Sequence, residues 1–277
     1  MTETARDLRD FSGRLVIVGA GKMGGALLEG WLRLGLDPKN IAVLEPQPTP
    51  QISTLGGRGL HINPSVSSLT NVEAIVIAVK PQIAAEALPP LASLIGASTL
   101  VVSIMAGRTI RSIASALNRP CALVRAMPNT PAAIGRGITV AVAHGANDAQ
   151  RDLAHRLLSA TGAVEWIEDE ALMDAVTAVS GSGPAYVFLL AETLALAGVA
   201  AGLPPALAAK LARETVSGSG ELLHRETTEA SVLRQNVTSP GGTTAAALEV
   251  LMGKDGLATL MKAAVAAATR RSRELAG

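Results

Sequence analysis

The segment Asn236–Thr244 places a Pro-Gly-Gly corner between Ser239 and a pair of threonines, Thr243 and Thr244, just before a run that is typical of a helix. Such a corner turns several backbone N–H groups toward one point, and N–H groups at the start of a helix bind carboxylates and phosphates. The same residue types also form ordinary capped turns between helices. The segment therefore indicates either an anion-binding turn or a plain helix cap.

A second segment, Gly19–Gly24, has the spacing G-x-G-x-x-G between the strand-like run Leu15–Val18 and a helix-like run. In that context the spacing is typical of dinucleotide binding. The first glycine permits a tight turn, the second lets the backbone approach a pyrophosphate, and the third lets the helix pack on the strand. The residues that we expect to bind a nicotinamide dinucleotide here are Gly19, Gly21, Lys22, Met23 and Gly24.

Glu45 follows Gly24 at about the 20-residue spacing at which an acidic residue hydrogen-bonds the ribose 2′-hydroxyl of NAD. A carboxylate at this position repels the 2′-phosphate of NADP, and no arginine immediately follows it. Alternatively, Glu45 points to solvent before Pro46. The sequence favours NADH without excluding NADPH.

Two further loops follow strand-like runs and lie where open α/β sheets bind ligands. The first consists of Ala78, Val79, Lys80 and Pro81, although Lys80 could instead be a plain solvated lysine. The second is the proline-containing segment Arg125–Pro131, which could also be no more than a stiff surface loop. We expect both loops to bind the cofactor, the second through Met127 and Asn129.

The elements that must position these residues alternate between strand and helix from Arg14 to about Glu168, which is the pattern of a doubly wound parallel sheet. We expect strands at Leu15–Val18, Ile41–Leu44, Ala74–Val79, Thr99–Ser103, Leu123–Ala126, Ile138–Ala143 and Val164–Ile167. The clearest helices between them are Met23–Leu34, Ile110–Leu117 and Ala149–Ala160.

After Glu170 the strand pattern disappears and the chain becomes rich in alanine and leucine with helical periodicity. Breaks are expected at Ser180–Pro184, at the pair Pro204 and Pro205, and at Ser239–Gly242. The sequence therefore predicts an α/β chain with a dinucleotide-binding domain over residues 1–168 and an all-helical domain over residues 169–277.

Composition excludes several classes of partner. The 277 residues include 24 basic and 23 acidic side chains, a net charge of +1, which gives no footprint for nucleic acid or an anionic membrane. One cysteine, Cys121, and four scattered histidines give no metal-ligand spacing, so we expect no metal site. The segment Met1–Gly13 lacks an apolar targeting region, and we therefore expect a cytoplasmic protein.

The run Pro184–Leu203 is apolar apart from Glu192 and is a weak transmembrane candidate by its length. It lacks aromatic belts and basic flanks. We expect instead a helix buried on all sides, covered by a core or by a subunit interface.

In their order along the chain, these segments resemble pyrroline-5-carboxylate reductase, the enzyme that makes L-proline from a cyclic imine. The resemblance spans nearly the whole chain and rests on Gly19–Gly24, Ala78–Pro81, Arg125–Pro131, Ser180–Tyr186 and Val237–Thr244. The last of these motifs is specific to the family.

The resemblance implies a Rossmann domain followed by a helical dimerisation domain, a homodimer with interleaved helices, and assembly into larger rings such as a decamer of dimers. It implies reduction of 1-pyrroline-5-carboxylate to L-proline with hydride from NAD(P)H, the last step of proline biosynthesis. Ser239 and the N–H groups of Gly242 and Thr243 match the positions that bind the substrate carboxylate. Thr244 matches the threonine near the imine nitrogen and is the expected catalytic residue, which orients the imine and relays a proton.

Two departures from the family pattern concern the cofactor. The family commonly uses NADPH and has a small polar residue near the end of the second strand, where this chain has Glu45. Ser65 stands where family members often have an asparagine near the adenosine ribose.

Two alternatives stay open. A β-hydroxyacid-type dehydrogenase would carry a catalytic lysine in its helical half, but Lys210 lacks the accompanying glycine and asparagine pattern. A non-catalytic dinucleotide-binding protein would be expected to have a degraded substrate turn, whereas Ser239–Thr244 is intact.

Overall fold

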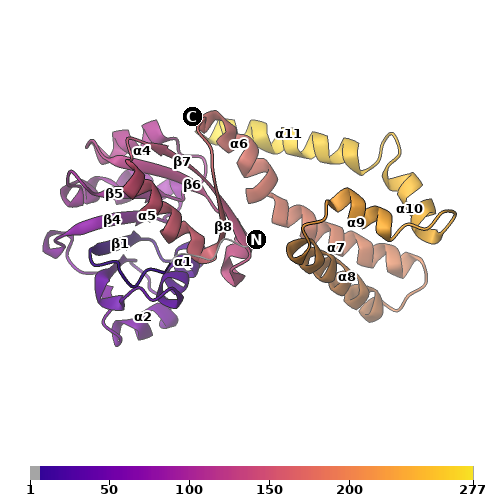
Figure 1. Cartoon of the computed structure of the whole chain (residues 1–277), viewed down its shortest axis with the longest axis horizontal. Coiled ribbons are helices and arrows are strands. Elements are labelled where there is room, and N and C mark those ends of the chain that lie inside the picture. The colour runs from indigo at the N-terminus through magenta and orange to yellow at the C-terminus, as the bar shows by residue number, and fades with distance from the viewer. Residues whose placement is uncertain (1–6, 277) are drawn as a thin grey trace. The chain divides into compact units, whose positions relative to one another are not determined.

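Short runs of aliphatic and β-branched residues form an eight-stranded sheet with the order β3-β2-β1-β4-β5-β6-β7-β8 (Figure 1). A computed structural model describes residues 7–276. The segment Met1–Gly13, for which no targeting region is expected, therefore lies partly outside the described residues. The strands are β1 Arg14–Val18, β2 Ile41–Leu44, β3 His61–Ile62, β4 Val72–Ile77, β5 Leu100–Ser103, β6 Ala122–Met127, β7 Gly137–His144 and β8 Gly162–Trp166.

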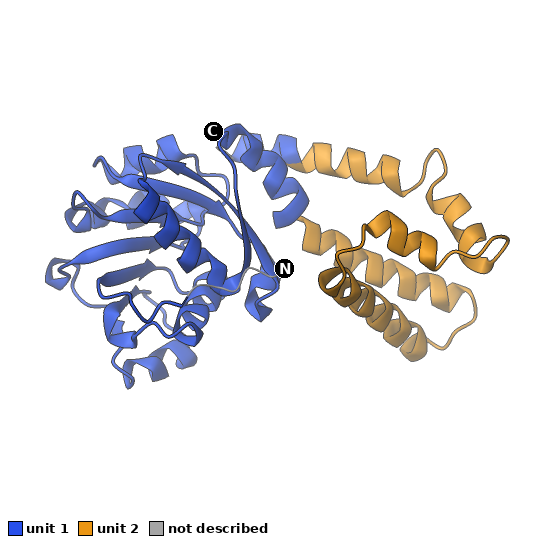
Figure 2. Cartoon of the chain, in the orientation of Figure 1, with its two compact units in different colours: residues 1–181, 269–277 blue, residues 182–268 orange. Residues whose placement is uncertain are grey.

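The described chain divides into two compact units (Figure 2). Unit 1 contains the residues up to Gly181 and those from Thr269 onward, and unit 2 is Ser182–Ala268. The strands end near the expected domain boundary at residues 168 and 169, whereas the division between the units falls after Gly181. Residues 170–181 are thus helical but belong to unit 1.

The helices of unit 1 are α1 Lys22–Arg33, α2 Pro50–Gly56, α3 Ala84–Ala87, α4 Ile110–Leu117, α5 Asp148–Leu158 and α6 Met173–Val176. Those of unit 2 are α7 Gly183–Ala200, α8 Pro205–Arg225, α9 Ala230–Asn236 and α10 Thr243–Leu251. Helix α11, Leu257–Ala276, begins in unit 2 and ends in unit 1. The doubly wound α/β fold followed by a helical region is confirmed.

One strand direction differs from the expected parallel sheet. Strand β7 pairs antiparallel with β6, and β8 pairs parallel with β7. A parallel connection needs a crossover of about a dozen residues or more. The segment between Met127 and Gly137 is shorter and holds only a 3₁₀ turn, Thr130–Ile134, so the chain returns beside β6 in the opposite direction.

Unit 1 builds its core on both faces of the sheet, because successive side chains of a strand point to opposite faces. Leu15 and Ile17 of β1 join one buried cluster, whereas Val16 and Val18 join the other. Residues of α1 and α5 fill the first cluster, and residues of α4 fill the second. Trp31 of α1 is fully buried and donates its indole N–H to the Leu157 carbonyl at 2.8 Å.

Helix α7 is not buried in a core of its own chain, which leaves the subunit interface of the two covers expected for it. None of its residues is buried, and Phe188 and Leu196 are 68% and 64% exposed. The helical stretch Glu170–Ala200 is the one stretch among the described residues that is long and apolar enough to cross a membrane, which is weak evidence by itself. Helix α7 packs on α8 on one side, and much of its remaining apolar surface has no cover within the described chain.

The expected break at Ser180–Pro184 does not stop the helical path. A π-helical turn, Thr177–Gly181, follows α6, and α7 begins at Gly183 with Pro184 in its first turn. The other two breaks separate helices as expected: α8 begins at Pro205, and α10 begins after Gly242.

Candidate cofactor site and substrate turn

The glycine loop between β1 and α1 uses its three glycines in two ways. A Cβ atom on Gly19, whose φ is +89°, would lie 2.8 Å from the Ala78 carbonyl oxygen, and one on Gly24 would lie 2.2 Å from the Gly19 carbonyl oxygen. A Cβ on Gly21 would meet no atom within 4 Å. The contacts of the chain itself therefore explain Gly19 and Gly24, while the open space at Gly21 fits the close approach of a pyrophosphate.

Helix α1 begins beside this space. Gly21 is its N-cap residue and provides no side-chain hydrogen bond, and Lys22 is the first helical residue. The first N–H groups of a helix have no acceptor within the helix and bind anions. Lys22 and Met23 thus contribute backbone donors where the cofactor phosphates are expected.

Glu45 follows β2 and turns toward the glycine loop rather than toward solvent. Its Oε2 accepts a hydrogen bond from the Ala20 N–H at 2.8 Å, and its Oε1 accepts one from the Gln47 N–H at 3.0 Å. Gly19 also donates its N–H to the Leu44 carbonyl at 2.8 Å, which ties the loop to the end of β2. The structure therefore brings Glu45 and the glycine loop together.

The loop Ala78–Pro81 begins earlier than expected, because β4 ends at Ile77. The Ala78 N–H donates to the Val18 carbonyl at 2.8 Å, and Arg108 donates to the Pro81 carbonyl at 2.8 Å. Lys80 is exposed and starts a short 3₁₀ turn. Through Ala78, this loop adjoins Gly19 at the carboxyl ends of neighbouring parallel strands, where the strand order reverses.

The loop after β6 has structural contacts of its own. Asn129 Oδ1 accepts a hydrogen bond from the Ile138 N–H at 3.0 Å, which closes the return to β7. A Cβ on Gly181 would lie 2.6 Å from the Met127 methyl carbon, so Met127 packs on the π-helical turn. Neither residue has a described contact with the glycine loop, and their expected roles in binding the cofactor stay predictions.

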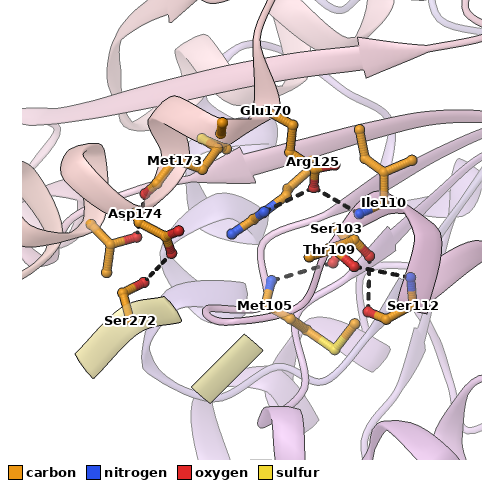
Figure 3. Close-up of polar contacts among 12 residues, drawn as sticks. Ser103, Met105, Thr109, Ile110, Ser112, Arg125, Glu170, Met173, Asp174 and Ser272 are labelled. Carbon is orange, nitrogen blue, oxygen red and sulfur yellow. Dashed lines mark hydrogen bonds and ion pairs between the residues drawn. The ribbon is translucent and has the colours of Figure 1, made fainter. Parts of the chain in front are cut away.

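A polar network anchors the helical segment that follows β8 (Figure 3). Glu170 Oε1 accepts hydrogen bonds from Arg125 and from the Ile110 N–H, each at 2.8 Å. Arg125 is 5% exposed, so the ion pair is largely withdrawn from water. Asp174 of α6 accepts a hydrogen bond from the Ser272 hydroxyl at 2.6 Å. These contacts fix α6 and the end of α11 within unit 1.

One carboxyl group and one thiol group of unit 1 have shifted pKa values, and neither belongs to the glycine loop. A hydrogen bond from Arg156 lowers the pKa of Asp10, a fully exposed group. Burial raises the pKa of the Cys121 thiol. The Cys121 side chain is half-buried against the second core cluster.

The turn Ser239–Thr244, where substrate is expected to bind, lies in unit 2 and is exposed. Gly241 has a φ of +69°, and Gly242 is the N-cap residue of α10 without a side-chain cap. A Cβ on Gly242 would lie 2.5 Å from the Ser239 hydroxyl oxygen, so only glycine fits against that hydroxyl. The turn thus presents Ser239 and the start of α10 on one side.

The donors of the turn differ in one respect from those expected. The Gly242 N–H donates to the Ser239 carbonyl at 3.0 Å and closes the turn. The N–H groups of Thr243 and Thr244, the first two residues of α10, have no acceptor within the described chain. Two backbone donors therefore remain for an anion, and the positive end of the helix dipole adds to them.

Sequence reasoning missed Asn63. Its side chain makes two hydrogen bonds to the Glu45 backbone, whereas Ser65, the residue expected near the ribose, bonds to Ser67. Asn63 has a φ of +48°, and an asparagine before a proline is a turn pattern that could have drawn attention to it. Lys210, weighed as a catalytic lysine, is exposed on α8.

Comparisons with known proteins match both parts of the chain. Residues 14–107 match the family described as NADP oxidoreductase, coenzyme F420-dependent, and residues 170–275 match the family described as pyrroline-5-carboxylate reductase dimerisation. A pyrroline-5-carboxylate reductase of Synechocystis sp. is 41% identical over 266 residues, which cover 95% of this chain and 98% of the relative.

Two solved structures are similar over nearly the whole chain. A pyrroline-5-carboxylate reductase from Coxiella burnetii has a TM-score of 0.88 and 32% identity, and the match covers 96% of this chain and 99% of that one. A pyrroline carboxylate reductase from Plasmodium falciparum with NADP bound has a TM-score of 0.80 and 30% identity, with the same coverage.

Proposed function

The chain belongs to the pyrroline-5-carboxylate reductase family, and on this premise we propose that it reduces 1-pyrroline-5-carboxylate to L-proline with hydride from NAD(P)H. The reaction is the last step of proline biosynthesis. The enzyme is an oxidoreductase with a nicotinamide-dependent Rossmann domain.

The single observation that carries this function is the Ser239–Thr244 turn. It combines a hydroxyl, two backbone N–H groups without an acceptor and the positive end of α10, and it has no basic side chain. A small carboxylate fits such a set of donors. The substrate is a five-membered ring that carries one carboxylate and one C=N bond.

In this mechanism the Ser239 hydroxyl and the Thr243 N–H hold the substrate carboxylate. Gly242 contributes by its lack of a side chain, because a Cβ would displace the Ser239 hydroxyl. Thr244, one residue further along α10, orients the imine nitrogen by a hydrogen bond and relays a proton to it. A threonine hydroxyl is a poor acid at neutral pH, so solvent or a protonated imine provides that proton.

NAD(P)H, when bound, supplies the hydride, and the residues of the chain position the cofactor for its transfer. The space at Gly21, the N–H groups of Lys22 and Met23, and the carboxylate of Glu45 fit a dinucleotide at the start of α1. Ala78–Pro81, Met127 and Asn129 line the nicotinamide half. Accurate positioning of reactants can contribute roughly 7 to 11 kcal/mol in the best intramolecular reactions.

A second copy of the chain covers α7 and completes a homodimer through unit 2. The match of residues 170–275 to a dimerisation family and the exposure of Phe188 and Leu196 support this assembly. Dimers associate further into larger rings, up to a decamer of dimers, in the cytoplasm. Light scattering gives the oligomer size, and cell fractionation gives the location.

The function is tested by following NADH and NADPH oxidation with 1-pyrroline-5-carboxylate as substrate. Turnover with at least one cofactor is expected, and turnover with neither would remove the proposal. Ser239→Ala should raise the KM for the pyrroline substrate by roughly tenfold, because one hydrogen bond to a charged group is lost.

The matched control is Ser231→Ala, an exposed serine on α9 outside the turn. It should leave the KM of the pyrroline substrate unchanged. An equal rise in both variants would show that unit 2 has been disturbed as a whole rather than at the carboxylate site.

A further inference from the structure

An asparagine fixes the end of β2 from the side away from the glycine loop. The Glu45 N–H donates to Asn63 Oδ1 at 2.8 Å, and Asn63 Nδ2 donates to the Glu45 carbonyl at 2.9 Å. Asn63 also donates its own N–H to the Val43 carbonyl at 2.8 Å. Its φ of +48° lies in the left-handed region, which asparagine tolerates better than most residues. The Glu45 backbone is thus held by a two-point side-chain contact.

The carboxylate of Glu45 is held from the opposite side. Its two oxygens accept hydrogen bonds from the N–H groups of Ala20 and Gln47. Prolines on either side of Gln47, at positions 46 and 48, stiffen the chain that follows. Backbone and carboxylate are therefore both held, and the Glu45 side chain cannot turn away from the glycine loop without breaking the two hydrogen bonds of its carboxylate.

A fixed carboxylate discriminates between the two nicotinamide cofactors. Each carboxylate oxygen keeps lone-pair capacity beyond one hydrogen bond, so it can accept from a ribose hydroxyl. A 2′-phosphate has no comparable donor at neutral pH and carries like charge, which is strongly unfavourable at short range. No lysine or arginine occurs between Glu45 and Arg58 to offset that charge.

We propose that Asn63 is a positioning residue for cofactor preference: its two hydrogen bonds to the Glu45 backbone hold the carboxylate beside the glycine loop, and the chain binds NADH in preference to NADPH. The proposal rests on the proposed function only in that the glycine loop binds a nicotinamide dinucleotide. Asn63 acts through Glu45 and does not touch the cofactor.

The test is the ratio of the dissociation constants of NADH and NADPH, measured by calorimetric titration of the full-length chain. The unaltered chain should bind NADH roughly 100-fold more tightly, and Glu45→Gln should remove most of this preference. Asn63→Gly keeps the left-handed backbone accessible and deletes both side-chain hydrogen bonds. It should reduce the preference about tenfold, the order expected for one or two lost hydrogen bonds.

The matched control is Asn118→Gly. Asn118 has a φ of +47° and ends α4, so the same substitution is made at the same backbone conformation without any contact to Glu45. The binding ratio should stay at its original value. Asn63→Ala also deletes the hydrogen bonds and should shift the ratio in the same direction as Asn63→Gly, which avoids the strain of a Cβ in this conformation.

An unchanged ratio in a folded Asn63→Gly protein would overturn the proposal, and so would an unaltered chain that prefers NADPH. The binding ratio also separates this proposal from the proposed function. A shifted ratio without any reduction of 1-pyrroline-5-carboxylate would support the role of Asn63 and overturn the proposed function.

Discussion

Helices α1 and α7 are both rich in apolar side chains, but they occupy opposite environments. In α1 of unit 1, Leu27 and Leu28 are each 1% exposed and Trp31 is fully buried. In α7 of unit 2, no residue is buried, and Phe188 is among the most exposed large side chains of the described chain. Unit 1 buries most of its apolar side chains in its own core, although some such as Ile134 stay exposed, whereas unit 2 buries very few.

The sequences of the two helices explain the difference. Helix α1 places its apolar residues on one face, so a single sheet can cover them. Helix α7 is apolar around its whole circumference, and Ala208 and Ala212 of α8 are the only buried residues of unit 2 among those described. A helix of that kind needs neighbours on all sides, which one chain does not provide here. Unit 1 should therefore fold independently of concentration, and unit 2 should not.

The largest effect is expected from Phe188→Asp, which places a charge on the uncovered face of α7. Association should weaken by roughly 100-fold or more, on the order of 3 kcal/mol for a central interface residue. Reductase activity should fall with it at low protein concentration. Light scattering and activity, each measured over a dilution series, check this prediction.

Both tryptophans, Trp31 and Trp166, lie in unit 1, so their fluorescence reports that unit separately. In Phe188→Asp the fluorescence transition on unfolding should keep its midpoint, while the helical circular dichroism should fall at low concentration. Phe188→Leu, which keeps the face apolar, is the control. A fluorescence midpoint that also depends on concentration would contradict the independence of unit 1.

The next effect concerns Arg125→Met within unit 1. The substitution leaves Glu170 with only the Ile110 N–H, and loss of one partner of a buried pair typically costs 3–5 kcal/mol. Because the Glu170 side chain is 30% exposed, we expect about 2 kcal/mol, seen in the tryptophan transition. Arg9→Met, which breaks a pair with the exposed Asp7, should cost less than about 1 kcal/mol. An equal loss of unfolding free energy in both variants would refute the larger contribution of the buried pair.

A smaller effect is expected from Thr244→Val in unit 2. The substitution removes the hydroxyl that orients the imine but keeps the shape of the side chain. The kcat should fall by about tenfold, within the lower range for lost acid–base assistance, while association stays intact. Steady-state kinetics at a concentration that maintains the oligomer gives the answer. Unchanged turnover in the intact assembly would exclude this role.

The smallest effect concerns the alkylation rate of Cys121, which tests whether unit 1 keeps its folded packing without a partner chain. Burial raises the pKa of its thiol, so at pH 8 less reactive thiolate is present than for a free cysteine. Alkylation by iodoacetamide should be several-fold slower than in the unfolded chain and should speed up as the pH rises toward the raised pKa. The rate should be the same in Phe188→Asp, and a faster rate there would show that unit 1 depends on the partner.

Much of the sheet could be predicted because its strands are compact runs of β-branched and aliphatic residues. The predicted strand Ile41–Leu44 and helix Ile110–Leu117 have the observed bounds. Strand β3 consists of only two residues, His61 and Ile62, which is too short to show an alternating pattern. The direction of β7 cannot be deduced from its amino-acid composition, because a buried strand has the same residue types whether it pairs parallel or antiparallel. Only the short connection from β6 carries that information.

The local structure of the two candidate loops was predictable where backbone geometry requires a particular residue. The glycine spacing gave the loop before α1, and the Pro-Gly-Gly corner gave the start of α10. The contact between Asn63 and Glu45 was not predictable, because it joins a side chain to a backbone in another loop without any periodic pattern. The cover of α7 could not be assigned for a related reason: an all-round apolar helix looks the same in a core and in a subunit interface.

The contact between Ser272 and Asp174 has a consequence for protein synthesis. Residues 269–276 leave the ribosome after all of unit 2, yet they complete the packing of α6 in unit 1. A nascent chain halted before Thr269 would have its sheet formed while the Asp174 carboxylate still lacks the Ser272 hydroxyl. Unit 1 is therefore translated first but completes its packing last. The apolar helices of unit 2 leave the ribosome before the end of α11 has packed on α6.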